Sequence, residues 1–340
     1  MGDNRGISAW VAAGCALLLA ALGASQLTQS GAGAAAARAS GPADHVLAIS
    51  IDGLNTNALT QLGRAQLPNI WRLLDQGMST LNARTSVEKT VTLPNHTGML
   101  TGRRVKASLG GHGVNINGYT DATVHDLAGH HVASIFEAAT DAGLDTALYT
   151  GKDKFDLFKN SWPADFDTFL TEADLATLVT AARADLVSEE TELIFLHMQA
   201  TDLAGHRYGF MSARYLDAVR ETDAQIGRLL NAIDNRPSVA DGLAVILTAD
   251  HGGAAGEKSH SSRTTLQNYR IPFVAWGEGT RSGDIYARNP DFRDPGTAHV
   301  SYKNRQPVRN ANLANLAMDL LGLDAVPGSG IDPDQTLDVN

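Results

Sequence analysis

Residues 45–53 read His-Val-Leu-Ala-Ile-Ser-Ile-Asp-Gly, a short apolar run that ends in an aspartate and a glycine. Such a run, rich in β-branched residues, predicts a buried β-strand over 45–51. Comparable runs predict four more strands, at 145–149, 192–198, 243–248 and 271–276. Helical patterns lie between them, at 67–76, 131–142, 172–186, 212–233 and 310–321. Apolar strands that alternate with helices predict an α/β fold, with a mostly parallel central sheet and helices on both faces.

The composition agrees with one globular domain that has a sizeable core. The chain has 340 residues, of which 43% are hydrophobic and 19% charged. Its formal net charge of −10 argues against non-specific nucleic-acid binding. Cys15 is the only cysteine, so the rest of the chain has neither a disulfide nor a thiolate ligand for a metal. We predict a single domain over 44–340, in which 277–307 forms a long irregular loop.

The first 39 residues have the features of a targeting segment. Arg5 precedes a nearly uncharged apolar run over 7–24, and an Ala/Gly-rich tract follows over 31–39. This order predicts a secretory signal peptide and a linker, with a small-x-small cleavage site at 37–39 and an alternative at 34–36. The run is also about long enough for an anchoring helix, so an uncleaved N-terminal anchor is the alternative. Either way, the protein is expected to be secreted or extracytoplasmic, in the cell envelope.

Three aspartates stand at the carboxyl ends of predicted strands, where open α/β sheets bind ligands. They are Asp52, Asp202 and Asp250, and two of them have a histidine nearby in sequence, His206 and His251. The spacing of Asp202 and His206 puts both on one face of a helical turn. Carboxylates with imidazoles favour a zinc-like divalent ion, although manganese or iron suits the same ligands. There are too many candidates for one tetrahedral ion, so the sequence predicts a pair of metals.

A threonine is the candidate nucleophile. Residues 90–96 read Thr-Val-Thr-Leu-Pro-Asn-His, and a proline suits the first turn of a helix, here expected over 93–102. Thr92 would lie at the N-terminus of that helix, where backbone N–H groups favour an anion. A hydroxyl that faces a metal pair is suited to displacement at phosphorus. Thr90 is the competing nucleophile, but it lacks the position at a helix start.

Taken together, these motifs resemble the alkaline phosphatase superfamily over about residues 45–325. The Thr-Leu-Pro-Asn-His version is most similar to the type I phosphodiesterase/nucleotide pyrophosphatase branch. The resemblance implies two metal ions, usually zinc, and a covalent phospho-threonine intermediate on Thr92. One ion would be held by Asp52, Thr92, Asp250 and His251, and the other by Asp202, His206 and one further histidine.

The resemblance also implies an asparagine that holds a phosphate oxygen, in a His-Gly-x-x-x-Asn setting. Residues 112–117 match this setting, which selects Asn117, with Asn115 as the fallback. For the further histidine, His260 is favoured over His299 because it follows the Asp-His-Gly motif closely.

The remaining basic candidates are expected to have other roles. Lys152 is interpreted as a solvated loop lysine rather than a phosphate contact. Two histidines near the site are expected to be structural, and four more to be surface or packing residues: His96 and His112, then His125, His130, His131 and His197.

The predicted function is a metal-dependent phosphoesterase that hydrolyses phosphodiester or pyrophosphate bonds of a small-molecule substrate. A phosphomonoesterase and a transferase that moves a phospho-alcohol group onto cell-envelope acceptors are rivals within the superfamily. A sulfatase is disfavoured, because its nucleophile derives from a Cys/Ser-x-Pro-x-Arg motif and the mature chain has no cysteine. A non-catalytic zinc-binding surface protein is the alternative from another class.

Overall fold

The computed structural model describes residues 41–340, so the predicted signal peptide lies outside the described residues. Within 41–340, eight strands form one sheet in the order β4-β3-β5-β1-β6-β7-β2-β8. Their bounds are β1 His45–Ile51, β2 Met78–Arg84, β3 Thr146–Thr150, β4 Thr168–Thr171, β5 Leu193–Met198, β6 Leu243–Thr248, β7 Arg270–Gly277 and β8 Gly283–Asp284. All five predicted strands are present, with bounds that differ by at most one residue at either end.

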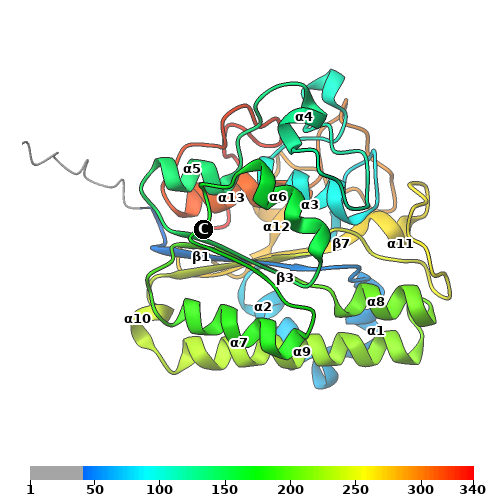
Figure 1. Ribbon diagram of the computed structural model, residues 1–340. Helices are drawn as coiled ribbons and strands as arrows, with labels where there is room; N and C mark the ends of the chain where they lie inside the picture. Colours follow the sequence, from blue (N-terminus) through cyan, green and yellow to red (C-terminus); the bar gives the residue numbers. More distant parts are fainter. Residues whose placement is uncertain (1–40) are drawn as a thin grey trace, which may run out of the picture. The chain divides into compact units, whose positions relative to one another are not determined.

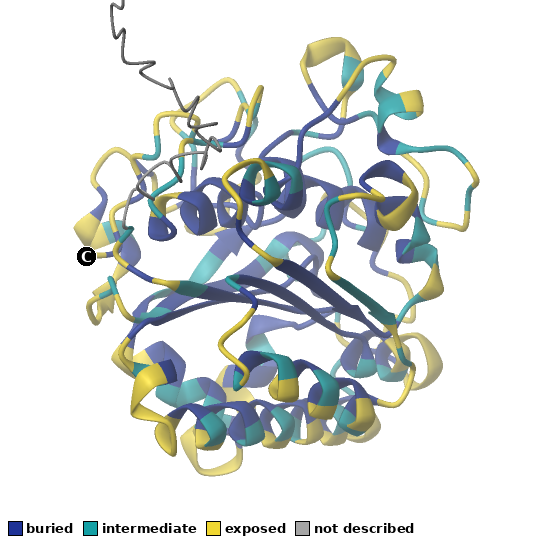
Figure 2. Ribbon diagram, turned by 60° about the vertical axis from the view of Figure 1, so that its left-hand side comes forward, coloured by how far each residue is buried: buried dark blue, intermediate teal, exposed yellow. Residues whose placement is uncertain are grey.

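The centre of the sheet is parallel and buried on both faces. Strand β1 pairs in parallel with β5 on one side and β6 on the other, and β3 pairs in parallel with β5 and β4. Every residue of β3, β5 and β6 is buried, as Figure 2 shows for the strands between the two helical layers. The apolar runs therefore reflect cover on both faces, and the predicted fold class is confirmed.

Helices pack on both faces of this sheet (Figure 1). One layer contains α1 Thr56–Gln66, α2 Pro68–Gln76, α7 Leu175–Leu186 and α9 Ala213–Asp234, and the other contains α3 Thr92–Thr101, α5 Ile135–Asp141 and α13 Asn312–Leu320. Shorter helices are α4 Val124–Ala128, α6 Asp156–Ser161, α8 Ala200–Tyr208, α10 Pro237–Ala240, α11 Leu266–Tyr269 and α12 Ile285–Arg288. Among residues 41–340, no helix is long and apolar enough to cross a membrane.

Side-chain caps explain where several of these helices begin. Ser134, Asp174 and Ser212 precede α5, α7 and α9, and each accepts a hydrogen bond from a backbone N–H in the first turn. Such a cap satisfies a donor that the helix itself leaves unpaired. The predictions over 131–142, 172–186 and 212–233 began one to four residues before these helices, whereas the prediction over 93–102 began one residue after the start of α3.

Strand β7 runs antiparallel to both β6 and β2. Residues 249–269, which connect β6 to β7, contain only the short helix α11 and do not cross the sheet. Since a parallel neighbour needs a crossover connection, β7 returns in the opposite direction. Strands β2, β4 and β8 were not predicted, because they lie toward the edges and are polar or very short.

The expectation of an irregular loop over 277–307 is wrong for one stretch. Gly283–Asp284 pairs with β2, and α12 follows immediately. Asp284 accepts hydrogen bonds from the N–H groups of Tyr286 and Ala287, which starts a helix inside an otherwise polar segment.

Candidate active site

Three buried aspartates meet at the carboxyl edge of the sheet. Asp52 follows β1, Asp250 lies two residues after β6, and Asp202 is in the first turn of α8, just after β5. In the sheet β1 lies between β5 and β6, so these three strand ends are neighbours. The side chains of all three aspartates are at most 2% exposed. The N–H of Gly53 donates to Asp250 Oδ1 over 3.0 Å, which ties the ends of β1 and β6 together.

We call Asp52, Asp250 and His251 the inner triad. His251 Nε2 lies 3.1 Å from Asp250 Oδ2 and 3.4 Å from Asp52 Oδ1. All three side chains are fully buried, so the ligand atoms face one another in a space closed to solvent. The backbone after His251 is tightly packed, since a Cβ at Gly253 would lie 2.2 Å from the Phe210 ring. Gly253 therefore allows this close packing of the loop against Phe210.

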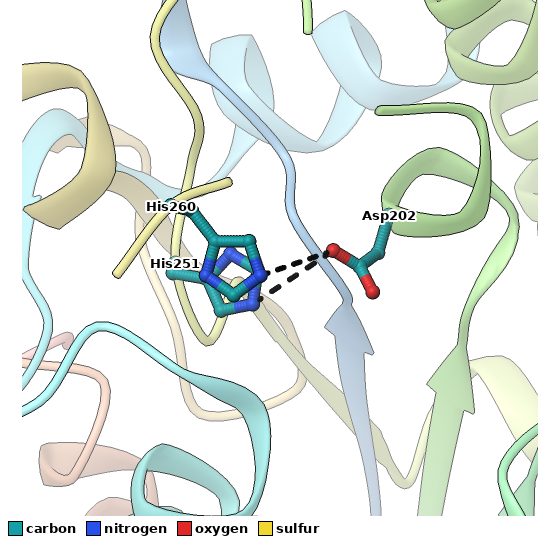
Figure 3. Close-up of side chains that lie close together, drawn as sticks. All are labelled: Asp202, His251 and His260. Atoms are coloured by element: carbon teal, nitrogen blue, oxygen red, sulfur yellow. Dashed lines mark ion pairs between the residues drawn. The ribbon is translucent and has the colours of Figure 1, made fainter. Parts of the chain in front are cut away.

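We call Asp202, His206 and His260 the outer triad. Asp202 Oδ1 lies 3.3 Å from His206 Nε2 and 3.5 Å from His260 Nε2, and the two imidazole nitrogens are 3.2 Å apart. The His206 side chain is 47% exposed, so this triad opens to solvent. Figure 3 shows the rings of His260 and His251 one over the other, both facing Asp202. Their centroids are 3.5 Å apart, so the two triads are contiguous.

The unpaired atoms in the triads are those that a cation would need. Asp52 Oδ1, Asp202 Oδ1, Asp250 Oδ2 and His251 Nε2 are buried and have no hydrogen-bond partner among the described residues. Leaving a buried polar atom unpaired costs on the order of 1–3 kcal/mol. Two groups have ligand atoms that all lie within 4.8 Å of one another, Asp52 with Asp250 and His251, and Asp202 with His251 and His260. Such carboxylate and imidazole groups fit divalent cations. The residues present therefore suit the metal chemistry that the sequence predicts.

The charges of the site also favour a bound cation. Burial opposes ionisation of Asp52, yet Lys152, His197 and His251 hold its pKa well below the usual value. Burial and the negative charges of Asp52 and Asp202 raise the pKa of Asp250 well above its usual value. Burial lowers the pKa of His251, so its ring is neutral and can donate a lone pair to a metal near pH 7. A cation beside Asp250 would offset the repulsion that this carboxylate experiences.

Thr92 is the first residue of α3, at the N-terminal end of that helix. Its side chain is 1% exposed, and its hydroxyl has no hydrogen-bond partner in the part of the chain that the structure describes. His96 connects this turn to the inner triad, because its Nδ1 lies 2.9 Å from the carbonyl oxygen of Thr92 and 3.6 Å from Asp250 Oδ2. The helix start therefore lies beside the inner triad.

The competing nucleophile Thr90 and the predicted phosphate-binding residue Asn117 both lie near Thr92, but they make different contacts. The hydroxyl of Thr90 donates to the carbonyl of His260 over 2.5 Å, so it is engaged in holding the outer triad. Asn117 Oδ1 accepts from the N–H of Leu93 over 2.9 Å, which puts the asparagine amide at the N-terminus of α3. Lys154 Nζ lies 3.3 Å from the same Oδ1. Asn115 is exposed and is not part of this group.

His299 lies away from both triads. It is exposed, and its ring packs 4.8 Å from that of Tyr269. Of the two histidines considered for the outer triad, the structure brings only His260 to Asp202.

Two residues that contact the carboxylates were assigned other roles from the sequence, and both assignments are wrong. Lys152 Nζ lies 2.5 Å from Asp52 Oδ2 and 2.6 Å from Asp202 Oδ2, rather than in solvent. His197 Nε2 lies 2.9 Å from Asp52 Oδ2, so it orients a candidate ligand rather than only packing. Lys152 closely follows the end of β3, so the strand-end rule that selected the aspartates would also have selected it.

The family model for type I phosphodiesterase/nucleotide pyrophosphatase matches residues 46–127 and 117–317. The chain belongs to this family. The resemblance inferred from the sequence motifs is thereby confirmed.

The curated relatives include ethanolamine phosphate transferases and a triphosphatase. GPI ethanolamine phosphate transferase 1 of Yarrowia lipolytica is 29% identical over 194 residues, which are 53% of this chain and 19% of that protein. Bis(5'-adenosyl)-triphosphatase enpp4 of Xenopus laevis is 25% identical over 62% of this chain and 47% of its own length. The chain thus spans about a fifth of the transferase and about half of the triphosphatase.

Solved structures share the fold. An inactive murine ectonucleotide pyrophosphatase/phosphodiesterase 5 in complex with AMP gives a TM-score of 0.61 at 13% identity, over 84% of this chain and 96% of that one. The lipoteichoic acid synthase LtaP from Listeria monocytogenes gives 0.57 at 15% identity, over 89% and 77%. At these identities the likeness concerns the fold alone, and it supports an alkaline phosphatase-like α/β architecture.

Proposed function

We propose that this chain is an extracytoplasmic phosphoesterase that hydrolyses phosphodiester or pyrophosphate bonds of a small-molecule substrate, with Thr92 as the nucleophile. The observation that carries the proposal is the meeting of the two contiguous Asp/His triads beside the helix start that carries Thr92. Two divalent ions, most typically zinc, would be held by the inner triad with Thr92 and by the outer triad. When bound, such ions supply Lewis acidity and make a hydroxyl or a water more acidic.

The residues at the start of α3 have separable roles in this reaction. Thr92 Oγ1 loses its proton and forms a bond to phosphorus, while the bond to the leaving oxygen breaks on the opposite side. The Asn117 side-chain NH2 group would donate to a phosphate oxygen, while its Oδ1 accepts from the N–H of Leu93. Water then cleaves the phospho-threonine ester and regenerates the hydroxyl.

A basic pocket beside the outer triad supports a substrate with a second anionic group, such as a pyrophosphate. Lys89, Lys106 and Arg263 line a cavity of about 480 Å³, and none of the three pairs with a carboxylate among the described residues. Glu88 also lines it, but its carboxylate is held by Arg104. Lys89 precedes Thr90, which contacts His260, and Arg263 follows His260 by three residues. A second anionic group of the substrate would be attracted there.

The test compares turnover of bis-p-nitrophenyl phosphate and p-nitrophenyl phosphate by the purified zinc-loaded protein and by Thr92→Ala. We expect faster turnover of the diester, and a loss of at least about a thousandfold in the variant with its zinc content unchanged. Acid-quenched mass spectrometry should find phosphate on the peptide that contains Thr92. Wild-type turnover by Thr92→Ala would refute the covalent mechanism.

A phospho-alcohol transferase is the second candidate, because ethanolamine phosphate transferases are among the curated relatives. The two functions share the first half of the reaction and differ in what attacks the phospho-threonine. Adding ethanolamine or a glycan alcohol to the diester assay separates them. A transferase forms a new phosphodiester at the expense of free phosphate ester, whereas a hydrolase gives the same products with and without the alcohol.

A further inference from the structure

Lys152 is a buried cation between the two triads that the catalytic proposal does not use. Its Nζ contacts Asp52 Oδ2 at 2.5 Å and Asp202 Oδ2 at 2.6 Å, and its side chain is 11% exposed. One ammonium group therefore joins a carboxylate of the inner triad to a carboxylate of the outer triad.

The two aspartates divide their oxygens in the same way. Each gives Oδ2 to Lys152, and each leaves Oδ1 buried without a hydrogen-bond partner among residues 41–340. Asp52 Oδ1 faces His251 at 3.4 Å, and Asp202 Oδ1 faces His260 at 3.5 Å. The lysine thus takes the oxygens that the triads do not use and leaves the other two free for metal ions.

The backbone fixes the lysine in this position. The N–H of Lys152 donates to the hydroxyl of Thr150, which is also 2.9 Å from His197 Nδ1. A Cβ at Gly151 would lie 2.5 Å from the side chain of Gln199, so the loop packs closely against the chain after β5. Lys152 is held by buried contacts rather than being a surface lysine that happens to reach inward.

We propose that Lys152 is a built-in counter-ion that stabilises the metal-free site and lowers its affinity for divalent ions. Without metal, the lysine is attracted by two carboxylates that would otherwise repel each other and Asp250, and these contacts outweigh its burial and the repulsion by Lys154. With metal bound, it keeps that attraction but is also repelled by the ions. The coupling between Lys152 and the metals is therefore unfavourable. This inference rests on the metal site of the proposed function.

Lys154 provides a matched control. It lies two residues away in the same loop and is half-buried, but its Nζ is directed to Asn117 rather than to the carboxylates. Replacing either lysine by methionine removes one positive charge and keeps most of the apolar stem. Only Lys152→Met removes the bridge between the triads.

The experiment measures thermal unfolding of the chelated full chain, and zinc affinity by competition with a chromophoric chelator. We expect Lys152→Met to unfold at a lower temperature than wild type when metal-free, and to bind zinc at least about tenfold more tightly. Lys154→Met should change the zinc affinity much less than Lys152→Met, because its ammonium group does not contact the carboxylates, and Lys152→Arg should keep the metal-free stability. If Lys152→Met fails to fold without metal, the rate of zinc loss from the folded, zinc-loaded protein decides the matter, and it should be slower than for Lys152→Arg.

Two other outcomes would overturn the inference. Zinc affinity in Lys152→Met that is equal to or weaker than wild type would make the lysine a positioning residue without counter-ion character. Unchanged zinc affinity with a raised KM for the diester would make it a substrate contact. Failure of the proposed function is distinguishable, because the wild-type protein itself would then bind no zinc and turn over no ester.

Discussion

The inner and outer triads use the same ligand types but have different surroundings. The inner triad is formed by residues that directly follow two adjacent parallel strands, and it is fully buried. The outer triad combines a short helix with the loop after β6, and its His206 is 47% exposed. The strand ends fix the inner ligands within a rigid sheet, whereas the outer ligands can be reached from solvent. The inner triad is thus the preformed part of the site and the outer triad its accessible part.

The largest expected effect comes from breaking the inner triad at Asp52. Asp52→Asn would leave Lys152 and His197 without the charge that both now contact. Breaking a buried ion pair on one side costs about 3 kcal/mol or more, and the ionised state of Asp52 is the one that the folded protein stabilises. We expect lower stability in chemical denaturation of the metal-free protein at pH 7, together with loss of diester turnover.

Asp250→Asn should act in the opposite direction on stability. Its carboxyl is raised in pKa by burial and by two neighbouring carboxylates, so its charge is unfavourable in the metal-free fold. Removing that charge should stabilise the metal-free protein at pH 7, while turnover and zinc binding are still lost. Equal destabilisation by Asp52→Asn and Asp250→Asn would contradict the opposite pKa shifts of these two carboxyl groups in the inner triad.

A smaller effect is expected from His206 in the outer triad. Because its side chain is half-exposed, His206→Ala should fold like the wild type and lose one of two zinc equivalents in elemental analysis. The inner equivalent should remain, and diester turnover should fall by about a hundredfold or more. His299→Ala is the control and should keep both equivalents. Loss of both equivalents in His206→Ala would show that the triads cannot be loaded separately.

The contrast between the triads also explains how much of the site was predictable. Asp52, Asp202 and Asp250 could be found because strand ends are marked by apolar runs, and parallel strand ends meet at one edge. No single stretch of sequence predicts the sheet order β5-β1-β6, which brings the three aspartates together. His260 was one of two candidates because it is in a loop, whose path depends on tertiary contacts such as those with Thr90.

The wrong assignments of His197 and Lys152 have the same physical cause, which is that tertiary packing decides what each side chain contacts. His197 is inside β5 between apolar neighbours and pairs in register with Ser50 of β1, two residues before Asp52. A pattern of apolar residues cannot distinguish a histidine that fills the core from one that orients a carboxylate. The position of Lys152 after β3 was a usable signal, although the packing of β3 beside β5 is what brings its side chain to the aspartates. Edge strands such as β4 were missed because half-exposed strands lack an apolar run.

The loss of stability at acid pH distinguishes a histidine that is only buried from one that binds a metal. His112 is fully buried outside both triads, and burial lowers its pKa to about 3. The unfolded chain binds this proton below about pH 6.5 and the folded chain does not, so stability falls as the pH decreases from about 6.5 to about 3. We expect His112→Gln to lose less stability than wild type over that window, by about 1.4 kcal/mol per pH unit. Denaturation of both proteins at pH 7 and pH 5, with and without zinc, checks this expectation. A difference that appears only with zinc would assign the effect to the metal site instead.

The smallest expected effect lies at the open end of the site, where the basic pocket adjoins the outer triad. Arg263 is exposed and follows His260 by three residues, so its charge can be removed without disturbing either triad. Arg263→Gln should raise the KM for ADP-type pyrophosphates by about three- to tenfold, because one attraction to a second anionic group is lost. Turnover of bis-p-nitrophenyl phosphate, which has a single charge, should be unchanged. Added salt should likewise raise the KM of the wild type for ADP-type pyrophosphates, because salt screens the exposed charge of Arg263. The buried inner triad should be screened much less. An equal rise of the KM for both substrates would place Arg263 at the reacting phosphate. The difference between an open outer triad with its basic pocket and a buried inner triad would then not hold.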